Sequence, residues 1–429
     1  MHDAKETIKT ISLIGLILLA VYQTTELWLG GMSSRNFFAI LRQVNHTAPA
    51  NEAEFRADFF IPGRILTGIG NNRFIVNHPT SKEQMVAEVS AVISTGLAQD
   101  DWAVLTDITA DLWATRNVVY DFGFDMPSDV YSAEMGGDLE AHLPYFSKMI
   151  IEPSDRLSNE TYLHFLNNNG GVTYKITSSS IHTTISNHIQ NTHVAFTNGE
   201  DDLHYISTDI MGFGFETNLF VPMWPGTSAL FQRIRPVNNH YANEPSLAEI
   251  GANMGQFFRD PASVWMDIRE EAFIYGDTTT VVRYQNGLLE YTNFRSSGTR
   301  GDVLSDFGVA RAFIDRDEMV TNDVFLTGFR AEQDQTVFYF DYIVNNFPLM
   351  LSLEERQDKG VDHFLTVTVE HSTVVHYKKV AYSFELTEEV EAYQTDIISF
   401  ADAFGTDMTT LTFGYLFRNA AVQVGWFFE

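Results

Sequence analysis

The sequence contains no cysteine among its 429 residues. This absence excludes disulfide frameworks, thiol nucleophiles and thiolate metal sites. Basic residues are also scarce, with 27 Lys and Arg against 56 Asp and Glu, which gives a net charge of −29. A chain this acidic repels the phosphates of nucleic acid, so a nucleic-acid-binding function is disfavoured.

The common sequence signatures of catalysis and nucleotide binding are missing as well. No GxSxG elbow, P-loop, GxGxxG turn, HExxH helix or EF-hand loop occurs. The acidic run Asp315–Glu318 lacks the glycine that a calcium loop needs, and we interpret it as an ordinary helix end. Two groups of histidines have no metal-ligand spacing and are interpreted as surface residues. They are His182, His188, His193 and His204, and His363, His371 and His376. The sequence therefore predicts no enzyme, no metal and no cofactor.

One long hydrophobic run stands near the start of the chain. The run Ile8–Leu29 would form about 33 Å of helix, which is enough to cross a hydrocarbon core of about 30 Å. Tyr22 and Trp28 lie near one end, where amphipathic rings favour the membrane interface. We expect a single-pass transmembrane helix over 8–29, with residues 1–7 in the cytoplasm and the later domains outside the cell. A cleaved signal peptide and a buried helix remain open, although the residues Ala20–Trp28 after the apolar core match a small-x-small cleavage site poorly.

The rest of the chain predicts an α+β fold of mixed, mainly antiparallel sheets with packed helices, because regular βαβ alternation is missing. Hydrophobic alternation and turn residues predict a hairpin around Gly70-Asn71-Asn72, a strand over Val118–Phe124 and several strands after residue 264. Helices are expected after Thr80, from Asp302 and from Thr387 to Gly405. Residues 182–226 are expected to form strands and long loops. The expected domains are an N-terminal ectodomain (30–194), a middle domain (195–328) and a C-terminal domain (329–429).

Three segments of the second half resemble the YycH family of membrane-anchored regulators. Gln256–Val264 (QFFRDPASV) is similar to the family's aromatic-Asp-Pro motif, and Val282–Tyr291 is similar to its following hairpin, with Asn286 in place of Asp. Tyr339–Leu349 is similar to the family's next turn pattern, and Val374–Lys379 to the strand after it. The motif residues are Phe258, Asp260, Pro261, Tyr284, Gly287, Tyr291, Tyr342, Asn345 and Pro348.

The resemblance implies a function in signalling without enzymatic activity. It implies an extracellular regulator of a sensor histidine kinase of the WalK/YycG type, part of the WalK/WalR (YycG/YycF) two-component system that serves cell-wall homeostasis. It also implies that a companion protein similar to YycI shares the membrane, and that regulation runs through contacts between transmembrane helices. A homodimer is left open.

The apolar run itself offers a contact face for such partners. Small and polar residues allow helices to associate closely in lipid. The residues that fall on one helical face are Ser12, Gly15, Leu19, Tyr22 and Gln23. Two other functions stay open at this point. One is an anchored hydrolase, and the other is an extracellular binding module for a cell-wall fragment or peptide, with loops such as Met223–Pro225.

Overall fold

The protein is described here by a computed structural model that covers most of the chain after residue 58. The expected transmembrane segment, 8–29, lies outside the described residues. Within the part of the chain that is described, no helix is long and apolar enough to cross a bilayer. The described residues are 59–76, 89, 92–98, 102–105, 110–136, 138–154, 159–167, 170–198, 204–207, 220–223, 229–237, 254–269, 272–295, 301–345, 347–393 and 411–428.

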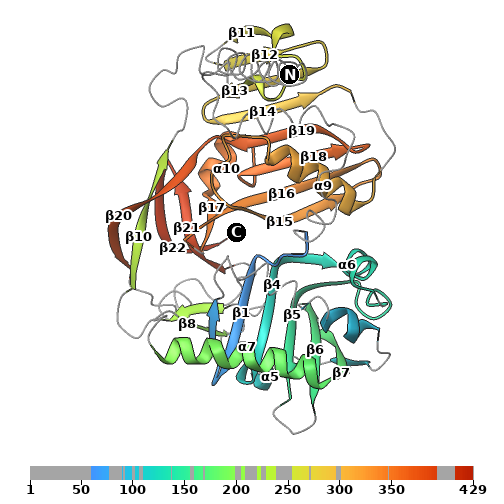
Figure 1. Cartoon of the computed structure of the whole chain (residues 1–429). Coiled ribbons are helices and arrows are strands. Elements are labelled where there is room, and N and C mark those ends of the chain that lie inside the picture. Colours follow the sequence, from blue (N-terminus) through green and yellow to red (C-terminus); the bar gives the residue numbers. More distant parts are fainter. Residues whose placement is uncertain are drawn as a thin grey trace, which may run out of the picture. The chain divides into compact units, whose positions relative to one another are not determined.

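The first half of the described chain builds a nine-stranded sheet with antiparallel pairs throughout (Figure 1). Its strand order is β3-β7-β6-β5-β4-β1-β2-β8-β9. The strands are β1 (Arg64–Gly70), β2 (Arg73–Val76), β3 (Trp102–Leu105), β4 (Arg116–Pro127), β5 (Tyr145–Pro153), β6 (Glu160–Asn167), β7 (Gly170–Thr177), β8 (His204–Ser207) and β9 (Phe220–Met223).

Helices cover one face of this sheet. Tyr131 of α6 (Ser128–Met135) packs edge-on against Phe146, with ring centroids 5.0 Å apart, and both side chains are buried. The long helix α7 (Ser179–Thr197) crosses β1, β4, β5 and β6 on this face (Figure 1). Its His188 shares a hydrogen bond of 3.0 Å with Thr67 of β1. A short helix, α5 (Ala110–Ala114), contacts β1.

The second half builds an eleven-stranded sheet. Its order is β11-β12-β13-β14-β19-β18-β16-β17-β21-β22, with β15 paired to β16. Every pair is antiparallel except β17–β21, which is parallel. The strands are β11 (Trp265–Arg269), β12 (Ala272–Gly276), β13 (Thr280–Gln285), β14 (Leu288–Asn293), β15 (Val324–Ala331), β16 (Gln335–Val344), β17 (Phe347–Leu351), β18 (Leu365–Glu370), β19 (Thr373–Val380), β21 (Leu411–Arg418) and β22 (Ala421–Phe428).

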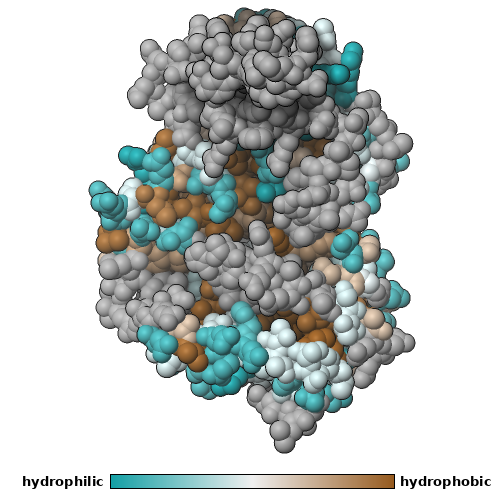
Figure 2. Space-filling view, viewed as in Figure 1, coloured by the Kyte–Doolittle hydropathy of each residue, from teal (hydrophilic) through white to brown (hydrophobic). Residues whose placement is uncertain are grey.

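Two helices pack against this second sheet. Helix α9 (Val303–Ile314) begins at Asp302, whose carboxylate accepts the Ser305 amide hydrogen at 2.7 Å. This is an N-cap, which satisfies one of the free amides at the start of the helix. Phe307 of α9 is buried against Phe338 of β16. Helix α10 (Leu353–Lys359) contacts β21, and Figure 2 shows hydrophobic residues gathered over the region of α10, β17 and β21.

The two halves meet through aromatic side chains. Phe59 lies 5.1 Å from Phe307 and 5.5 Å from Phe329 between ring centroids, and Phe124 of β4 lies 6.1 Å from Phe329. Phe59 and Phe307 are fully buried. Aromatic pairs of this kind bury large apolar area, so the contact between α9, β15 and the first sheet belongs to the hydrophobic core.

The expected α+β class with mainly antiparallel sheets is confirmed. The hairpin around Gly70-Asn71-Asn72 is present as β1–β2, with Asn71 and Asn72 both in the left-handed region. The strand over Val118–Phe124 lies within β4. The helix from Asp302 is also present, with the expected cap.

The prediction of strands and loops from residue 182 is wrong for its first part, which is the end of α7. Ile185 and Ile189 lie four residues apart on one side of this helix and are buried against the sheet. The Ser, Thr and Asn residues around them have low helix propensity, so the local composition conceals a helix that tertiary burial stabilises. Of the strands expected after residue 264, the first two are β11 and β12.

The helix predicted over Thr387–Gly405 is wrong for its first seven residues, and its remainder, 394–405, lies outside the described residues. Residues Ser383–Tyr393 form strand β20, which pairs antiparallel with β10 (Ala229–Val237) in a two-stranded sheet. Thr387 donates its hydroxyl hydrogen to the Arg233 carbonyl at 3.1 Å instead of capping a helix. Because β10 lies far away in the sequence, no local pattern around Thr387 reveals this partner.

The expected domain limits stay predictions. The limit at 194/195 falls inside α7, and the limit at 328/329 falls inside β15, which pairs with β16 along its length. Domain limits normally lie in linkers, so these two would move to the ends of the elements that they cut.

Candidate functional site

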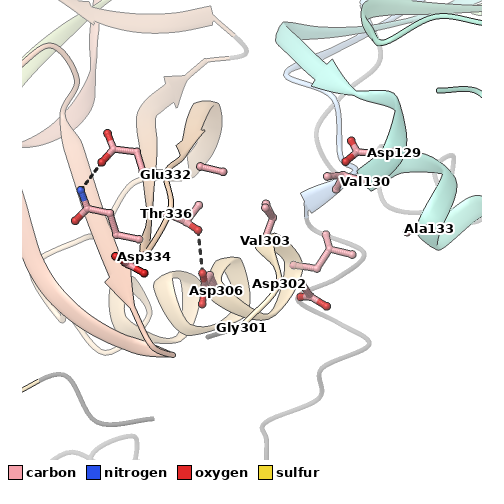
Figure 3. Close-up of a pocket in the computed structure, with 13 residues that line it drawn as sticks. Asp129, Val130, Ala133, Gly301, Asp302, Val303, Asp306, Glu332, Asp334 and Thr336 are labelled. Atoms are coloured by element: carbon pink, nitrogen blue, oxygen red, sulfur yellow. Dashed lines mark hydrogen bonds between the residues drawn. The ribbon is translucent and has the colours of Figure 1, made fainter. Parts of the chain in front are cut away.

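A cavity of about 370 Å³ is lined by residues from both halves of the described chain (Figure 3). Three separate segments line it: the start of α6, the start of α9 and the turn between β15 and β16. The lining residues are Asp129, Val130, Ala133, Gly301, Asp302, Val303, Leu304, Asp306, Ala331, Glu332, Asp334, Gln335 and Thr336.

Carboxylates dominate the polar lining of this cavity. Asp306 is 4% exposed and accepts a hydrogen bond of 2.9 Å from the Thr336 hydroxyl (Figure 3). Asp302 is held by its capping bond to Ser305. Glu332 accepts a bond of 2.8 Å from the Gln335 amide and pairs with Arg330 at 2.8 Å. Asp302 and Glu332 are thus held by neighbours on their own segments, whereas Asp306 of α9 is bonded to the β15–β16 segment.

The lining residues include five carboxylates and neither Lys, Arg nor His. Such a lining repels anions and favours a positively charged or hydrogen-bond-donating group. Within the described residues, no three His, Asp or Glu side chains are grouped to hold a metal ion. The cavity lining also lacks a histidine base beside a hydroxyl, which nucleophilic catalysis would need. The carboxylate lining suits the binding of a cationic group.

The most deeply buried charges lie elsewhere, between α9 and the second sheet. Lys379 of β19 and Asp317 form an ion pair at 2.5 Å, with side chains that are 1% and 0% exposed. Tyr377 donates its hydroxyl hydrogen to the same carboxylate at 2.8 Å, and the Met319 amide donates at 3.1 Å. Burial lowers the pKa of Lys379 against the opposing effect of Asp317, and burial raises the pKa of Tyr377.

The sequence did not predict this pair, because Asp315–Glu318 has the composition of an ordinary helix end. A signal was available in β19, where Tyr377 and Lys379 occupy inward positions of an alternating strand. A lysine at an inward position needs a carboxylate partner. The partner itself could not be chosen from so many acidic residues.

The first sheet carries a second set of charges on the face opposite Tyr131. Arg64 donates to Asp121 at 2.7 Å, and Lys148 lies 3.9 Å from the same carboxylate. Burial raises the pKa of Asp121, but Lys148 and Arg64 outweigh it, so the pKa lies below its ordinary value. On the same face, His164 contacts Thr173 at 2.8 Å and Glu152 at 3.2 Å.

The predicted motif residues Phe258, Asp260 and Pro261 lie at a short helical turn. The Asp260 side chain accepts the Ala262 amide hydrogen at 3.1 Å, and its carbonyl accepts from the Ser263 amide and hydroxyl. The 3-10 helix Pro261–Ser263 follows directly, where the missing amide hydrogen of proline costs nothing. Phe258 is buried, at 6% exposure.

The other predicted motif residues lie in turns and in the core of the second sheet. Asn286 and Gly287 both have positive φ, as the tight turn between β13 and β14 requires. Asn345 is left-handed after β16, and the Pro348 carbonyl lies where a side chain on Gly414 of β21 would stand. The three motif tyrosines are buried, and they are Tyr284, Tyr291 and Tyr342.

The structure does not bring the remaining predicted residues to one site. The stripe Ser12, Gly15, Leu19, Tyr22 and Gln23 lies outside the described residues, and so does Trp224–Pro225. His182 and His188 lie on α7 and contact the first sheet at Ser154 and Thr67. His363 bonds Asp341 at 2.8 Å, whereas His371 lies in the turn between β18 and β19.

Comparison with known proteins gives a match in structure and none in sequence. The sequence matches no family model and no curated protein. The fold is similar to the crystal structure of YycH from Bacillus subtilis, with a TM-score of 0.52 and 10% identity over 86% of this chain and 93% of that one. An uncharacterized protein from Eubacterium rectale matches with a TM-score of 0.33 and 10% identity, over 49% of this chain and 80% of that one. The chain therefore has a YycH-like fold.

Proposed function

We propose that the protein is a non-enzymatic, membrane-anchored extracellular regulator of a sensor histidine kinase of the WalK/YycG type. The observation that carries this proposal is the YycH-like fold across 86% of the chain. It is supported by the sequence motifs of residues 256–264, 282–291 and 339–349, which resemble those of the YycH family. Phe258, Asp260 and Gly287 of these motifs hold the turns and core of the second sheet.

In this proposal the segment 8–29 spans the membrane and touches the kinase and a YycI-like companion. Its small and polar stripe packs against the partner helices and favours one of two signalling arrangements. The described domains lie outside the cell and bias that choice. The acidic composition keeps such a domain away from anionic lipid headgroups.

The direct test replaces residues 8–29 with an unrelated spanning helix of the same length. The intact protein should co-purify with a histidine kinase from membranes, and the chimera should lose both the kinase and the regulation. Full regulation by a chimera that is expressed and correctly inserted would contradict the proposal.

A more specific test of the helix contact compares two small-to-large substitutions within residues 8–29. Gly15→Leu places a bulky side chain on the proposed contact stripe, whereas Ala20→Leu places it away from the stripe. We expect Gly15→Leu to reduce kinase co-purification and Ala20→Leu to leave it unchanged, because close helix approach needs a small residue at the interface.

The proposed orientation has its own test, which uses the lack of cysteine. A single cysteine at the exposed position Leu353 should react with a membrane-impermeant maleimide in intact cells, while one in residues 1–7 should react only after lysis. The opposite pattern would place the domains in the cytoplasm.

The alternative function is an extracellular binding module for a cell-wall fragment or peptide. The cavity between α6, α9 and the β15–β16 turn favours it, because a space of about 370 Å³ with a carboxylate lining suits a cationic peptide. A rise in the melting temperature of the protein with a lysine-rich peptide would support this function. The rise should vanish in Asp129→Asn/Asp334→Asn, and an equal rise with an acidic peptide would argue against it.

A further inference from the structure

Among the described residues, exposed large apolar side chains are most closely spaced on β11, at one end of the second sheet (Figure 1). Trp265, Met266 and Ile268 are 48%, 44% and 49% exposed within a strand of five residues. Within the described residues, β11 pairs with β12 and with no other strand. An exposed apolar edge strand is a ready template for pairing with another strand.

The free side of β11 can be identified from one hydrogen bond. The Ile268 amide donates to the Asp267 carboxylate at 2.9 Å, so this amide points away from β12. In an antiparallel pair the backbone groups of alternate residues point to the same side. Met266 and Ile268 therefore present their amide and carbonyl groups to the free edge, and Asp267 covers one of these amides.

The charges on this edge are balanced within the strand. Asp267 also accepts a bond of 2.6 Å from Arg269, two residues further along. Both side chains are largely exposed, so this pair contributes little to the fold and can exchange partners at small cost.

We infer that a second copy of this chain pairs antiparallel with β11 about a twofold axis at Ile268. Ile268 then faces Ile268 of the second copy, and their backbone groups exchange two hydrogen bonds. Asp267 faces Arg269 of the second copy, twice by symmetry, so each ion pair within a strand is replaced by one between strands. The two Asp267–Arg269 pairs are self-complementary in charge, as the centre of a twofold contact must be.

The two neighbouring registers fit less well. A twofold axis at Asp267 would place the two Asp267 carboxylates directly opposite each other, which is destabilising. A twofold axis at Met266 would place Asp267 opposite Trp265 and leave both charges without partners on the other strand. Charge complementarity thus selects the register at Ile268.

Single cysteines test the pairing and its register, since the natural chain has none to interfere. Residues opposite each other in a hydrogen-bonded pair have Cα atoms about 5.5 Å apart, which suits a disulfide. In the full-length protein, Ile268→Cys should form a disulfide-linked dimer about tenfold faster than Leu353→Cys, an exposed apolar position on α10, because the cysteines of a preassembled dimer react at high effective concentration.

Two further variants determine the register. Met266→Cys and Asp267→Cys should cross-link more slowly than Ile268→Cys. Faster cross-linking at either position would overturn the register, and equal rates at positions 268 and 353 would overturn pairing at β11 altogether. Each variant is compared with the natural chain by melting temperature, so that a folding defect is recognised.

A charge exchange provides the second, independent measurement. Asp267→Arg places two arginines opposite each other and should lower the dimer fraction in analytical ultracentrifugation, and Arg269→Asp should do the same with two aspartates. The double variant Asp267→Arg/Arg269→Asp restores opposite charges across the axis and should restore the dimer. A double variant as monomeric as the single ones, or a natural chain that stays monomeric at high concentration, would overturn the inference.

Discussion

The two large sheets carry their charges in different places. The first sheet gathers Arg64, Asp121 and Lys148 on the face away from Tyr131, where Arg64 is one-third exposed and solvent shares in stabilising the charges. The second sheet places Asp317 and Lys379 fully inside, against α9, where Tyr377, the Met319 amide and the Gln256 side chain also donate to the carboxylate. A charge on a partly exposed face tolerates the loss of its partner, whereas a fully buried charge does not.

The largest expected effect comes from breaking the fully buried pair. Lys379→Met leaves the Asp317 carboxylate buried without its cation, and it should cost about 3–5 kcal/mol of unfolding free energy. Denaturant unfolding of the full chain measures this. Asp317→Asn/Lys379→Met removes both charges and keeps an acceptor for the Met319 amide, so it should recover about half of the loss or more. A double variant no more stable than the single one would show that packing, rather than charge, sets the cost.

A smaller effect is expected at Asp121, and it should depend on pH. Asp121→Asn weakens the bonds from Arg64 and Lys148 and should cost about 1–3 kcal/mol at neutral pH. Because the folded pKa of Asp121 is depressed, its contribution is complete above its unfolded pKa of about 3.9 and is lost as the pH falls through the folded value.

Unfolding measured between pH 3 and 6 checks this dependence. The stability gap between the natural chain and Asp121→Asn should narrow as the pH falls below about 4. A constant gap would show that Asp121 acts through hydrogen bonds that do not depend on its charge.

The smallest effect is expected from a matched lysine on the first sheet. Lys175 pairs with Glu160 at 2.7 Å, but its side chain is 38% exposed. Lys175→Met should change the unfolding free energy by less than about 1 kcal/mol, because exposed ion pairs contribute little. The same substitution at Lys379 is then several times more costly. If both substitutions lowered the unfolding free energy equally, the proposed difference between exposed and buried charges in the two sheets would be wrong.

The sequence predicted correctly those turns and helix ends that depend only on residues within a few positions of each other. Asn71 and Asn72 accept the left-handed conformation of a tight turn, and Asp302 caps α9 with its own carboxylate. Both patterns lie within a few residues, so the sequence was sufficient for them. It was insufficient for α7 and β20, where burial against distant strands decides the conformation.

In the candidate site, too, the residues in local turns could be predicted and those brought together by folding could not. The motif residues Asp260 and Gly287 were identified from the sequence, since each occupies a turn that its own backbone conformation requires. The cavity was not predicted from the sequence, because Asp129, Asp306 and Glu332 come from three separate segments of the chain. The Asp317–Lys379 pair likewise depends on a contact that only the folded sheet creates.

The parallel pairing of β17 with β21 has a consequence for how the protein is made. Leu349 pairs with Tyr415, and β22 then pairs with β21. While the chain is being synthesised, one edge of β17 stays unpaired until β21 has been made, and parallel pairing across such a sequence distance forms slowly. Chaperones or other nascent chains can bind this open edge, so the rate at which β21 pairs with β17 determines how long each new molecule stays prone to aggregation.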